Sequence, residues 1–307
     1  MDLSIIIVSW NVCQKLEENL ERLFASKKIN FSDKNRRNFF KAEVFVIDNN
    51  SSDDSVYMLR KKFPLVKLIS NQENFGFARA NNQAIKRAKG DFILLLNPDM
   101  KVFENTLEKM IDWMHQKSAV SVATCKLVNQ NNQVVRDNVR KFPKFLDQIL
   151  IIFKIPHLFP RIIKKYRQLD FDYDKEARVD SVRGAFFFIR RNFVESVCDA
   201  LDNNISLPFL DEKYFLWFEE VDFCKQVYKK GGQVWYTPIT KCVNYIGSSF
   251  SQVDNLQKQK YFSRSMIVYF SKWHSVFSVF LLKISWLVVL SFYNLVNLFT
   301  RKKFVKL

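Results

Sequence analysis

Short apolar runs alternate with segments of helical periodicity over the first hundred residues, and this alternation constrains the fold more than any other feature. Four runs rich in isoleucine, valine and leucine cover residues 3–9, 44–47, 66–70 and 92–96. Almost continuously apolar runs are typical of strands buried on both faces of a sheet. Between them, apolar residues recur every three or four positions, as on the buried face of a helix. The pattern predicts an α/β fold with a parallel sheet and right-handed crossovers.

The second half of the chain is less regular. We expect further strands near residues 119–123, 184–189 and 233–236, and a helix over 215–229, where apolar side chains have helical spacing. The lysine- and asparagine-rich stretch 27–41 is predicted to be an exposed insertion.

The net charge of the chain limits the classes of partner that it is expected to bind. The 307 residues carry a formal net charge of +17, which suits nucleic acid, an anionic membrane surface or phosphate-bearing substrates. The basic residues are spread along the chain, and no helix-turn-helix, zinc-finger or RNA-recognition pattern occurs. We therefore expect no nucleic-acid partner.

The cysteines form no C-x-x-C pair, which predicts free thiols, a reducing compartment and no structural zinc site. They are Cys13, Cys125, Cys198, Cys224 and Cys242. The apolar N-terminal run is short and lacks a basic lead-in, so no signal peptide is expected.

Polar residues follow three of the predicted strands. Ser9-Trp10-Asn11 follows the first strand, Asp48 the second and Asn97-Pro98-Asp99 the fourth. Ligands of open α/β sheets gather at the carboxyl ends of the strands. These residues therefore predict a ligand site at one edge of the sheet.

Asp48 and Asp99 each allow two interpretations. Asp48 either caps a helix or accepts a hydrogen bond from a nucleotide base or ribose, and Asp53 and Asp54 fit the capping role better. Asp99 is either a turn residue after Pro98 or a ligand of a hard cation that neutralises a diphosphate leaving group.

An acidic cluster follows the aromatic run 214–218. It consists of Glu219, Glu220 and Asp222. Close carboxylates in apolar surroundings raise one another's pKa, which suits a general base. The alternative is a solvated acidic start of a helix.

Several enzyme classes lose their main sequence support. Neither a G-x-x-x-x-G-K-[ST] loop nor a G-x-G-x-x-G fingerprint occurs, which argues against kinases, ATPases and Rossmann dehydrogenases. The three histidines lack the spacing of metal ligands.

Taken in order, these segments resemble glycosyltransferase family 2, and the subgroup of rhamnosyltransferases and related cell-surface polysaccharide enzymes looks most similar. The resemblance covers roughly residues 2–273 and is carried by 4–11, 46–53, 74–82, 95–99, 184–191 and 211–222. It implies a GT-A fold with a mostly parallel nucleotide-binding sheet flanked by helices. We expect this domain over 1–273, with a nucleotide-sugar part (1–125) and an acceptor part (126–273), before a membrane-associated helix (274–307).

The resemblance also implies an inverting, single-displacement transfer of a hexose or deoxyhexose such as rhamnose from a nucleoside diphosphate sugar to a lipid-linked or surface-glycan acceptor. Asp99 matches the metal-binding aspartate of the D-x-D element, with Mg²⁺ or Mn²⁺ as the metal, and Glu220, beside Glu219, matches the catalytic base. The implied nucleotide-sugar residues are Ser9, Asn11, Asp48, Asn74, Gly76, Asn81 and Asn97. The implied acceptor and donor pocket contains Gly184, Ala185, Arg190, Trp217 and Asp222.

Two positions depart from the family pattern. Glu220 stands where aspartate is usual, and Asn244 lies near a position that often carries histidine. A misplacement of about 1 Å can cost about a hundredfold in rate. The alternative to an active enzyme is therefore a weak or inactive homologue that binds sugar nucleotides or glycans. Specificity is expected to depend on residues 126–182, where the pattern is least defined.

Two apolar and basic segments, 145–169 and 276–299, predict contact with a membrane. Lys283, Asn294 and Asn297 fall on one helical face, which suits an interfacial helix as well as a span. We expect the protein at the cytoplasmic face of the inner membrane, attracted by anionic lipid and attached peripherally or by a single C-terminal anchor. A helix packed on the sheet is the alternative for 145–169.

Overall fold

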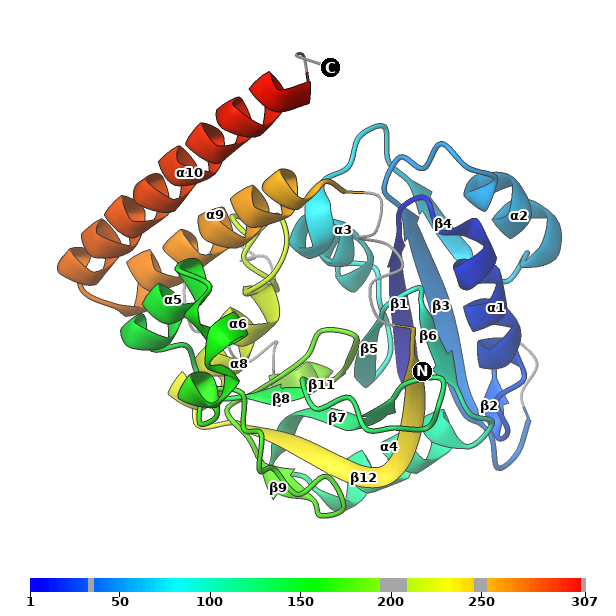
Figure 1. Cartoon of the computed structure of the whole chain (residues 1–307). Coiled ribbons are helices and arrows are strands. Elements are labelled where there is room, and N and C mark those ends of the chain that lie inside the picture. The colour runs from blue at the N-terminus through cyan, green and yellow to red at the C-terminus, as the bar shows by residue number, and fades with distance from the viewer. Residues whose placement is uncertain (33–35, 194–208, 246–252, 305–307) are drawn as a thin grey trace, which may run out of the picture.

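The protein is built on a ten-stranded sheet with helices on both sides (Figure 1). The computed structural model describes residues 1–32, 36–193, 209–245 and 253–304. In these residues the strand order is β2-β3-β1-β5-β11-β7-β12-β6, with β4 paired to β3 and β9 to β12. The α/β prediction is therefore confirmed.

The first half of the sheet is parallel, as predicted. β1 pairs in parallel with β3 and β5, and β3 pairs in parallel with β4. The bounds are β1 Leu3–Ser9, β3 Phe40–Asp48, β4 Lys67–Ser70 and β5 Phe92–Leu96, connected by α1 Cys13–Phe24, α2 Ser55–Lys62 and α3 Gly76–Ile85. Along β1, Leu3, Ile5 and Ile7 pack into one core cluster and Ile6 into the cluster on the other face. Burial on both faces explains why this strand is apolar almost throughout.

The second half of the sheet is mixed. Its strands are β6 Met100–Val102, β7 Val120–Val128, β11 Phe186–Arg190 and β12 Gln233–Asn244. β11 runs antiparallel to β5 and β7, and β12 runs parallel to β7 but antiparallel to β6. The expectation of a mostly parallel sheet therefore holds only for the N-terminal half. A fully buried strand such as β11 has the same apolar pattern in either direction, so its sequence does not reveal its orientation.

Short elements fill the connections. They are β2 Ile29–Asn30, α4 Thr106–Gln116, β8 Val139–Arg140, α5 Phe145–Ile152, α6 Ile155–Leu158, η1 Pro160–Ile163, β9 Ala177–Arg178 and β10 Ser181–Val182. The predicted insertion 27–41 is not wholly exposed, because the buried strand β2 pairs with the start of β3. β8 and β10 form a separate two-stranded sheet.

The C-terminal part consists of α8 Glu219–Lys229, α9 Asn255–Trp273 and α10 Val276–Phe304. The helix expected over 215–229 begins only at Glu219, because Trp217 and Phe218 have positive φ angles of 65° and 70°. α10 lies along α9 and also contacts α5 (Figure 1).

No helix in the described part of the chain is long and apolar enough to cross a bilayer. Lys283, Ser285 and Ser291 interrupt the apolar sequence of α10. The C-terminal anchor is therefore unsupported.

Candidate active site

Ser9 and Asp48 lie next to each other at the carboxyl ends of β1 and β3, where they are register partners. Both are buried. Among the described residues, neither Ser9 Oγ nor Asp48 Oδ1 has a hydrogen-bond partner. Buried polar atoms are seldom left unpaired in proteins. These two oxygens therefore favour a polar ligand at this edge of the sheet.

The other carboxylate oxygen of Asp48 stabilises the following turn, because Ser51 N–H donates to Asp48 Oδ2 at 3.1 Å. Of the two predicted capping residues, Asp53 bonds backbone N–H groups at the starts of α1 and α2, whereas Asp54, at the N-cap of α2, makes no side-chain cap bond. Asp53 Oδ2 accepts from Cys13 N at 2.8 Å and its Oδ1 accepts from Ser55 N at 3.1 Å. Asp48 therefore keeps one oxygen directed away from the turn bond.

Asn11 joins the loops that follow β1 and β3. It has a positive φ of 52°, and Asn11 Oδ1 accepts from Ser52 N at 2.7 Å. Its own N–H donates to Ser51 Oγ at 2.9 Å. Asn11 thus shapes the rim of the predicted nucleotide pocket.

Three side-chain amides organise the loop before α3. Asn49 Nδ2 donates to Asn74 Oδ1 at 3.0 Å, and Asn71 Nδ2 donates to Asn49 Oδ1 at 2.9 Å. Asn74 Oδ1 also accepts from Gly76 N at 2.9 Å. Asn74 therefore sets the turn at Gly76. The central residue Asn49 was not among the predicted site residues, because the network joins loops distant in sequence.

Gly76 connects this loop to the segment that carries the acidic cluster. Its φ is +78°, and a Cβ there would lie 2.3 Å from Phe215 O. Phe77 N donates to Phe215 O at 2.8 Å. One helical turn further on, Asn82 Nδ2 donates to Leu210 O at 2.8 Å. The predicted nucleotide side of the site and the acidic segment are thus joined by direct contacts.

Asp99 lies in the turn between β5 and β6 and is 6% exposed. Asn97 N donates to Ala185 O at 3.0 Å, which places this turn beside the start of β11. Asn244, in register with Met100, lies on the neighbouring strand β12. Residues 246–252, which follow Asn244 and Tyr245, lie outside the described residues.

A metal site at Asp99 would need ligands from the substrate. Within the described ranges, no group of three His, Cys, Asp or Glu side chains is arranged to hold a metal. Mg²⁺ commonly binds one or two carboxylates and takes its remaining oxygens from water and substrate phosphates. One buried carboxylate at a strand end fits that kind of site.

Glu219 and Glu220 begin α8 and are buried. Glu219 Oε2 and Glu220 Oε2 both lack a hydrogen-bond partner in the described part of the chain. Burial raises the pKa of both carboxyls, and repulsion from Glu220 raises that of Glu219 further. The solvated acidic helix start is therefore excluded, and Glu220 has the raised pKa expected of a general base.

Gly184 and Ala185 bring the start of β11 between Glu220 and Asn97. A Cβ on Gly184 would lie 3.7 Å from Glu220 Cβ, an ordinary contact. Ala185 O, as noted, accepts the Asn97 N–H. The acidic cluster and the carboxyl edge of the sheet therefore meet at the same place.

Two guanidiniums that were not predicted lie near Glu220. Arg140 and Arg183 both lower the pKa of Glu220 by their positive charge, which opposes the effect of burial. Arg183 directly precedes Gly184, while Arg140 lies in the segment whose pattern is least defined. No spacing in the sequence indicates that Arg140 and Arg183 lie near Glu220 in the fold.

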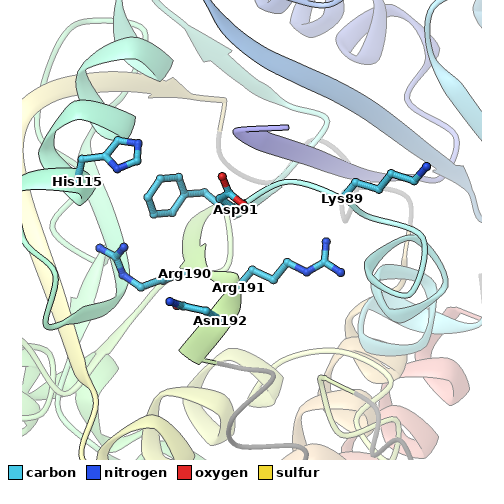
Figure 2. Close-up of a pocket in the computed structure, with 7 residues that line it drawn as sticks. Lys89, Asp91, His115, Arg190, Arg191 and Asn192 are labelled. Carbon is cyan, nitrogen blue, oxygen red and sulfur yellow. The ribbon is translucent and has the colours of Figure 1, made fainter.

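Arg190 is not brought to this edge. It pairs with Phe92 at the start of β5, and its side chain donates to Val120 O at 2.9 Å and Lys117 O at 3.1 Å. With His115, Arg191 and others, Arg190 lines a cavity of about 620 Å³, and Figure 2 shows these side chains. Arg190, predicted for the pocket, therefore lies at the end of the sheet away from Asp99, because β11 runs antiparallel to β5.

Asp222 has a different environment from its two acidic neighbours. It is fully buried and accepts hydrogen bonds from Lys272 Nζ at 2.7 Å and Trp273 Nε1 at 2.5 Å. Asp222 therefore connects α8 to α9.

Two other predicted site residues make local contacts. Trp217 packs edge-on against Phe262, with ring centroids 6.2 Å apart. Asn81 Nδ2 donates to Phe77 O at 2.8 Å, a bond within α3.

Residues 4–193 match the sequence family described as glycosyl transferase family 2. An uncharacterized glycosyltransferase of Haemophilus influenzae is 28% identical over 167 residues, which are 53% of this chain and 53% of that protein. Rhamnosyltransferase WbbL of Escherichia coli (strain K12) is 24% identical over 178 residues, 56% of this chain and 61% of WbbL. The chain thus spans a little over half the length of these relatives.

Among solved structures, the mannosyltransferase PcManGT from Pyrobaculum calidifontis, in complex with GDP-Man and Mn²⁺, is similar in fold. The TM-score is 0.52 at 16% identity, and the alignment covers 88% of this chain and 63% of that one. At this identity the likeness shows a shared fold alone.

Proposed function

The chain belongs to glycosyl transferase family 2, and from this membership we propose that it transfers a sugar from a nucleoside diphosphate sugar to a lipid-linked or cell-surface glycan acceptor, with inversion at the anomeric carbon. The proposal is carried by one observation. Buried oxygens of Ser9, Asp48 and Glu220 lack partners among the described residues, and the contacts of β11 join the two halves of this site.

Ser9 and Asp48 are proposed to bind the nucleoside. Asp48 Oδ1 suits a base or ribose donor group, since its other oxygen is used by the turn. Asp99 is proposed to hold Mg²⁺ or Mn²⁺ together with the donor diphosphate. The bound cation would offset the charge that develops on the leaving diphosphate.

Glu220 is proposed to act as the base. It accepts the proton of an acceptor hydroxyl while that oxygen attacks the anomeric carbon. The bond between that carbon and the donor phosphate oxygen breaks, and the nucleoside diphosphate leaves with the electron pair. Direct displacement from the opposite side inverts the anomeric centre. The raised pKa of Glu220 makes it a stronger base than an exposed carboxylate.

The test is a donor screen that measures nucleoside diphosphate release with Mg²⁺ or Mn²⁺ and a membrane lipid extract as acceptor. Glu220→Gln should lower kcat about 10²- to 10⁴-fold, because it removes the base. Asp99→Ala should cost about two orders of magnitude or more. The control is Asp54→Asn, at an exposed aspartate that makes no capping bond. Full transfer by both active-site variants would rule out this mechanism.

The second candidate is a homologue that binds sugar nucleotides or glycans without turnover. It is favoured by Glu220 in place of aspartate and by Asn244 beside the Asp99 turn. Its signature is metal-dependent nucleotide binding, abolished by Asp99→Ala, without diphosphate release for any donor. Turnover that depends on Glu220 would exclude it.

We propose that the protein is attached peripherally to the cytoplasmic face of the inner membrane and binds its acceptor there. Support comes from the exposed apolar side chains of α10 and of the α6–η1 segment. The most exposed are Val276 (86%), Phe277 (68%), Leu287 (63%), Leu158 (78%) and Phe159 (64%). Exposed apolar groups close to many Lys and Arg residues are typical of surfaces that bind anionic bilayers.

A further inference from the structure

Arg140 and Arg183, here called the arginine pair, are held by the small sheet that packs beside the start of α8. Arg140 in β8 is the register partner of Ser181 in β10. Arg183, directly after β10, donates its backbone N–H to Asn138 O at 2.9 Å. The backbone at both arginines is thus hydrogen-bonded or paired, which fixes the positions of their Cα atoms.

Asp137 satisfies only part of the hydrogen-bonding capacity of the arginine pair. Its Oδ1 accepts from Arg140 Nε at 2.9 Å and its Oδ2 from Arg140 Nη2 at 2.5 Å. Arg183 Nη1 lies 3.9 Å from the same Oδ2. A guanidinium carries five N–H donors. Within the described ranges the remaining donors of both arginines have no hydrogen-bond partner, and the two side chains are 29% and 31% exposed.

The charges around this place do not balance. One carboxylate, Asp137, faces two guanidiniums, and Arg167 adds further positive charge near it. Asp137 raises the pKa of Arg140, so that this guanidinium stays protonated. Burial opposes the ionisation of Glu220, the other carboxyl near the two arginines, and raises its pKa although their positive charges lower it. An anionic ligand would relieve this imbalance and use the remaining donors.

We propose that the arginine pair binds a phosphate or diphosphate group of the acceptor, beside the hydroxyl that Glu220 deprotonates. Planar guanidiniums match phosphate oxygens in paired hydrogen bonds. The arginine pair belongs to the β8–β10 sheet, whereas Ser9, Asp48 and Asp99 lie at the edge of the main sheet. Both arginines lie near Glu220, the proposed base for the acceptor hydroxyl, and this position assigns the arginine pair to the acceptor rather than to the donor diphosphate.

The chain that follows β8 suits an acceptor whose phosphate carries an apolar tail. α5 begins at Phe145, shortly after Arg140, and leads to the exposed Leu158 and Phe159. A lipid-linked diphosphate sugar has its anionic group between the sugar and the hydrocarbon. In that arrangement the sugar reaches Glu220, the diphosphate meets the arginine pair and the tail extends toward the apolar helices. This inference rests on the proposed transferase function.

The first test compares two acceptors with the same sugar, a lipid diphosphate sugar and an alkyl glycoside without phosphate. Hydrogen bonds to charged groups contribute about 1.5–3 kcal/mol. Arg140→Gln and Arg183→Gln should therefore each raise KM for the phosphorylated acceptor by about 10- to 100-fold. KM for the donor and for the alkyl glycoside should change little. The control is Arg178→Gln, an arginine on β9 that stacks on Tyr228 at 4.7 Å.

Two outcomes would overturn the proposal. One is an equal rise of KM for both acceptors, which would indicate general damage to the pocket. The other is a rise of KM for the donor alone, which would assign the arginine pair to the donor diphosphate. Arg140→Lys guards against misfolding, because it retains the positive charge but loses the bidentate geometry. It should recover part of the affinity for the phosphorylated acceptor.

A second measurement separates this proposal from the proposed function. Binding of inorganic pyrophosphate is measured by calorimetry without divalent metal, in an Asp99→Ala background that weakens the donor site. The arginine pair predicts binding that is lost in Arg140→Gln and retained in Arg178→Gln. Such binding, together with no transfer to any acceptor by the protein with Asp99 intact, would reject the transferase and keep the anion site. Transfer without arginine-dependent pyrophosphate binding would keep the transferase and reject the anion site.

Discussion

Glu219 and Glu220 are adjacent in the chain but have different charged neighbours. Glu219 is repelled by Glu220, whereas Glu220 is stabilised in its charged form by Arg140 and Arg183. Two carboxyls in one buried place thus differ in how readily they ionise. The two arginines favour the charged form of Glu220, which agrees with its proposed role as base.

The first prediction at this scale concerns the pH profile of transfer. A base must be deprotonated, so kcat should fall on acidification through the raised pKa of Glu220. Arg140→Gln removes a positive charge, raises this pKa further and should move the acidic limb to higher pH. The pH dependence of kcat under saturating substrates measures this. An acidic limb that stays in place in Arg140→Gln would contradict it. Arg178→Gln should leave the limb in place.

The second prediction concerns stability. The pKa of Glu219 is higher in the folded protein than in the unfolded chain, so the folded state binds the proton more tightly. Its contribution is favourable at low pH and is lost as the pH rises from the unfolded pKa toward the folded one. Glu219→Gln removes this penalty and should raise the melting temperature at pH 7 but less at pH 4. An equal change at both pH values would contradict the assignment.

At the scale of elements, the contact between the Gly76 loop and the segment before α8 joins the proposed donor side of the site to the proposed acceptor side. Gly76→Ala brings a Cβ to 2.3 Å from Phe215 O at a positive φ. Gly231 is the matched control, since its φ is +80° and nothing lies within 4 Å of its Cβ position. Gly231→Ala should cost about 1–2 kcal/mol from backbone strain alone. Gly76→Ala should cost clearly more in urea unfolding and should also weaken nucleotide binding. Equal costs would show that the contact with Phe215 is unimportant.

At the scale of the whole molecule, the exposed apolar side chains of α10 support the proposed attachment to the membrane. Phe277 and Phe280 are 68% and 56% exposed. Burying a phenylalanine side chain contributes about 1.5–3 kcal/mol. Phe277→Ser with Phe280→Ser should therefore lower affinity for vesicles with anionic lipid by about a hundredfold or more. Sedimentation with vesicles of phosphatidylglycerol and phosphatidylcholine measures this.

The control for this experiment is Tyr57→Ser, where the tyrosine is 64% exposed and belongs to α2. This helix lies on the opposite side of the sheet from α10 (Figure 1). It should leave vesicle binding unchanged. Binding that is the same for all variants, or that is absent at low salt, would reject attachment through α10.

Local sequence determined much of this protein. The strands and helices of the first hundred residues, the polar groups at the ends of β1, β3 and β5, and the buried acidic start of α8 follow from apolar periodicity and from residue chemistry. These properties depend on neighbours within a few positions in the sequence. Each strand is almost continuously apolar, which indicates burial on both faces of the sheet. The match of residues 4–193 to the family confirms the resemblance, and it covers all the segments that carried it except 211–222.

Only the tertiary structure decided what depends on pairing across long stretches of chain. The antiparallel direction of β11 moved Arg190 to the far end of the sheet. Contacts with α9 gave Asp222 a structural role, and the β8–β10 sheet brought Arg140 and Arg183 to Glu220. An apolar pattern records that a strand is buried but not which strand it meets or in which direction. An arginine likewise has no local signal for the carboxylate that it will face.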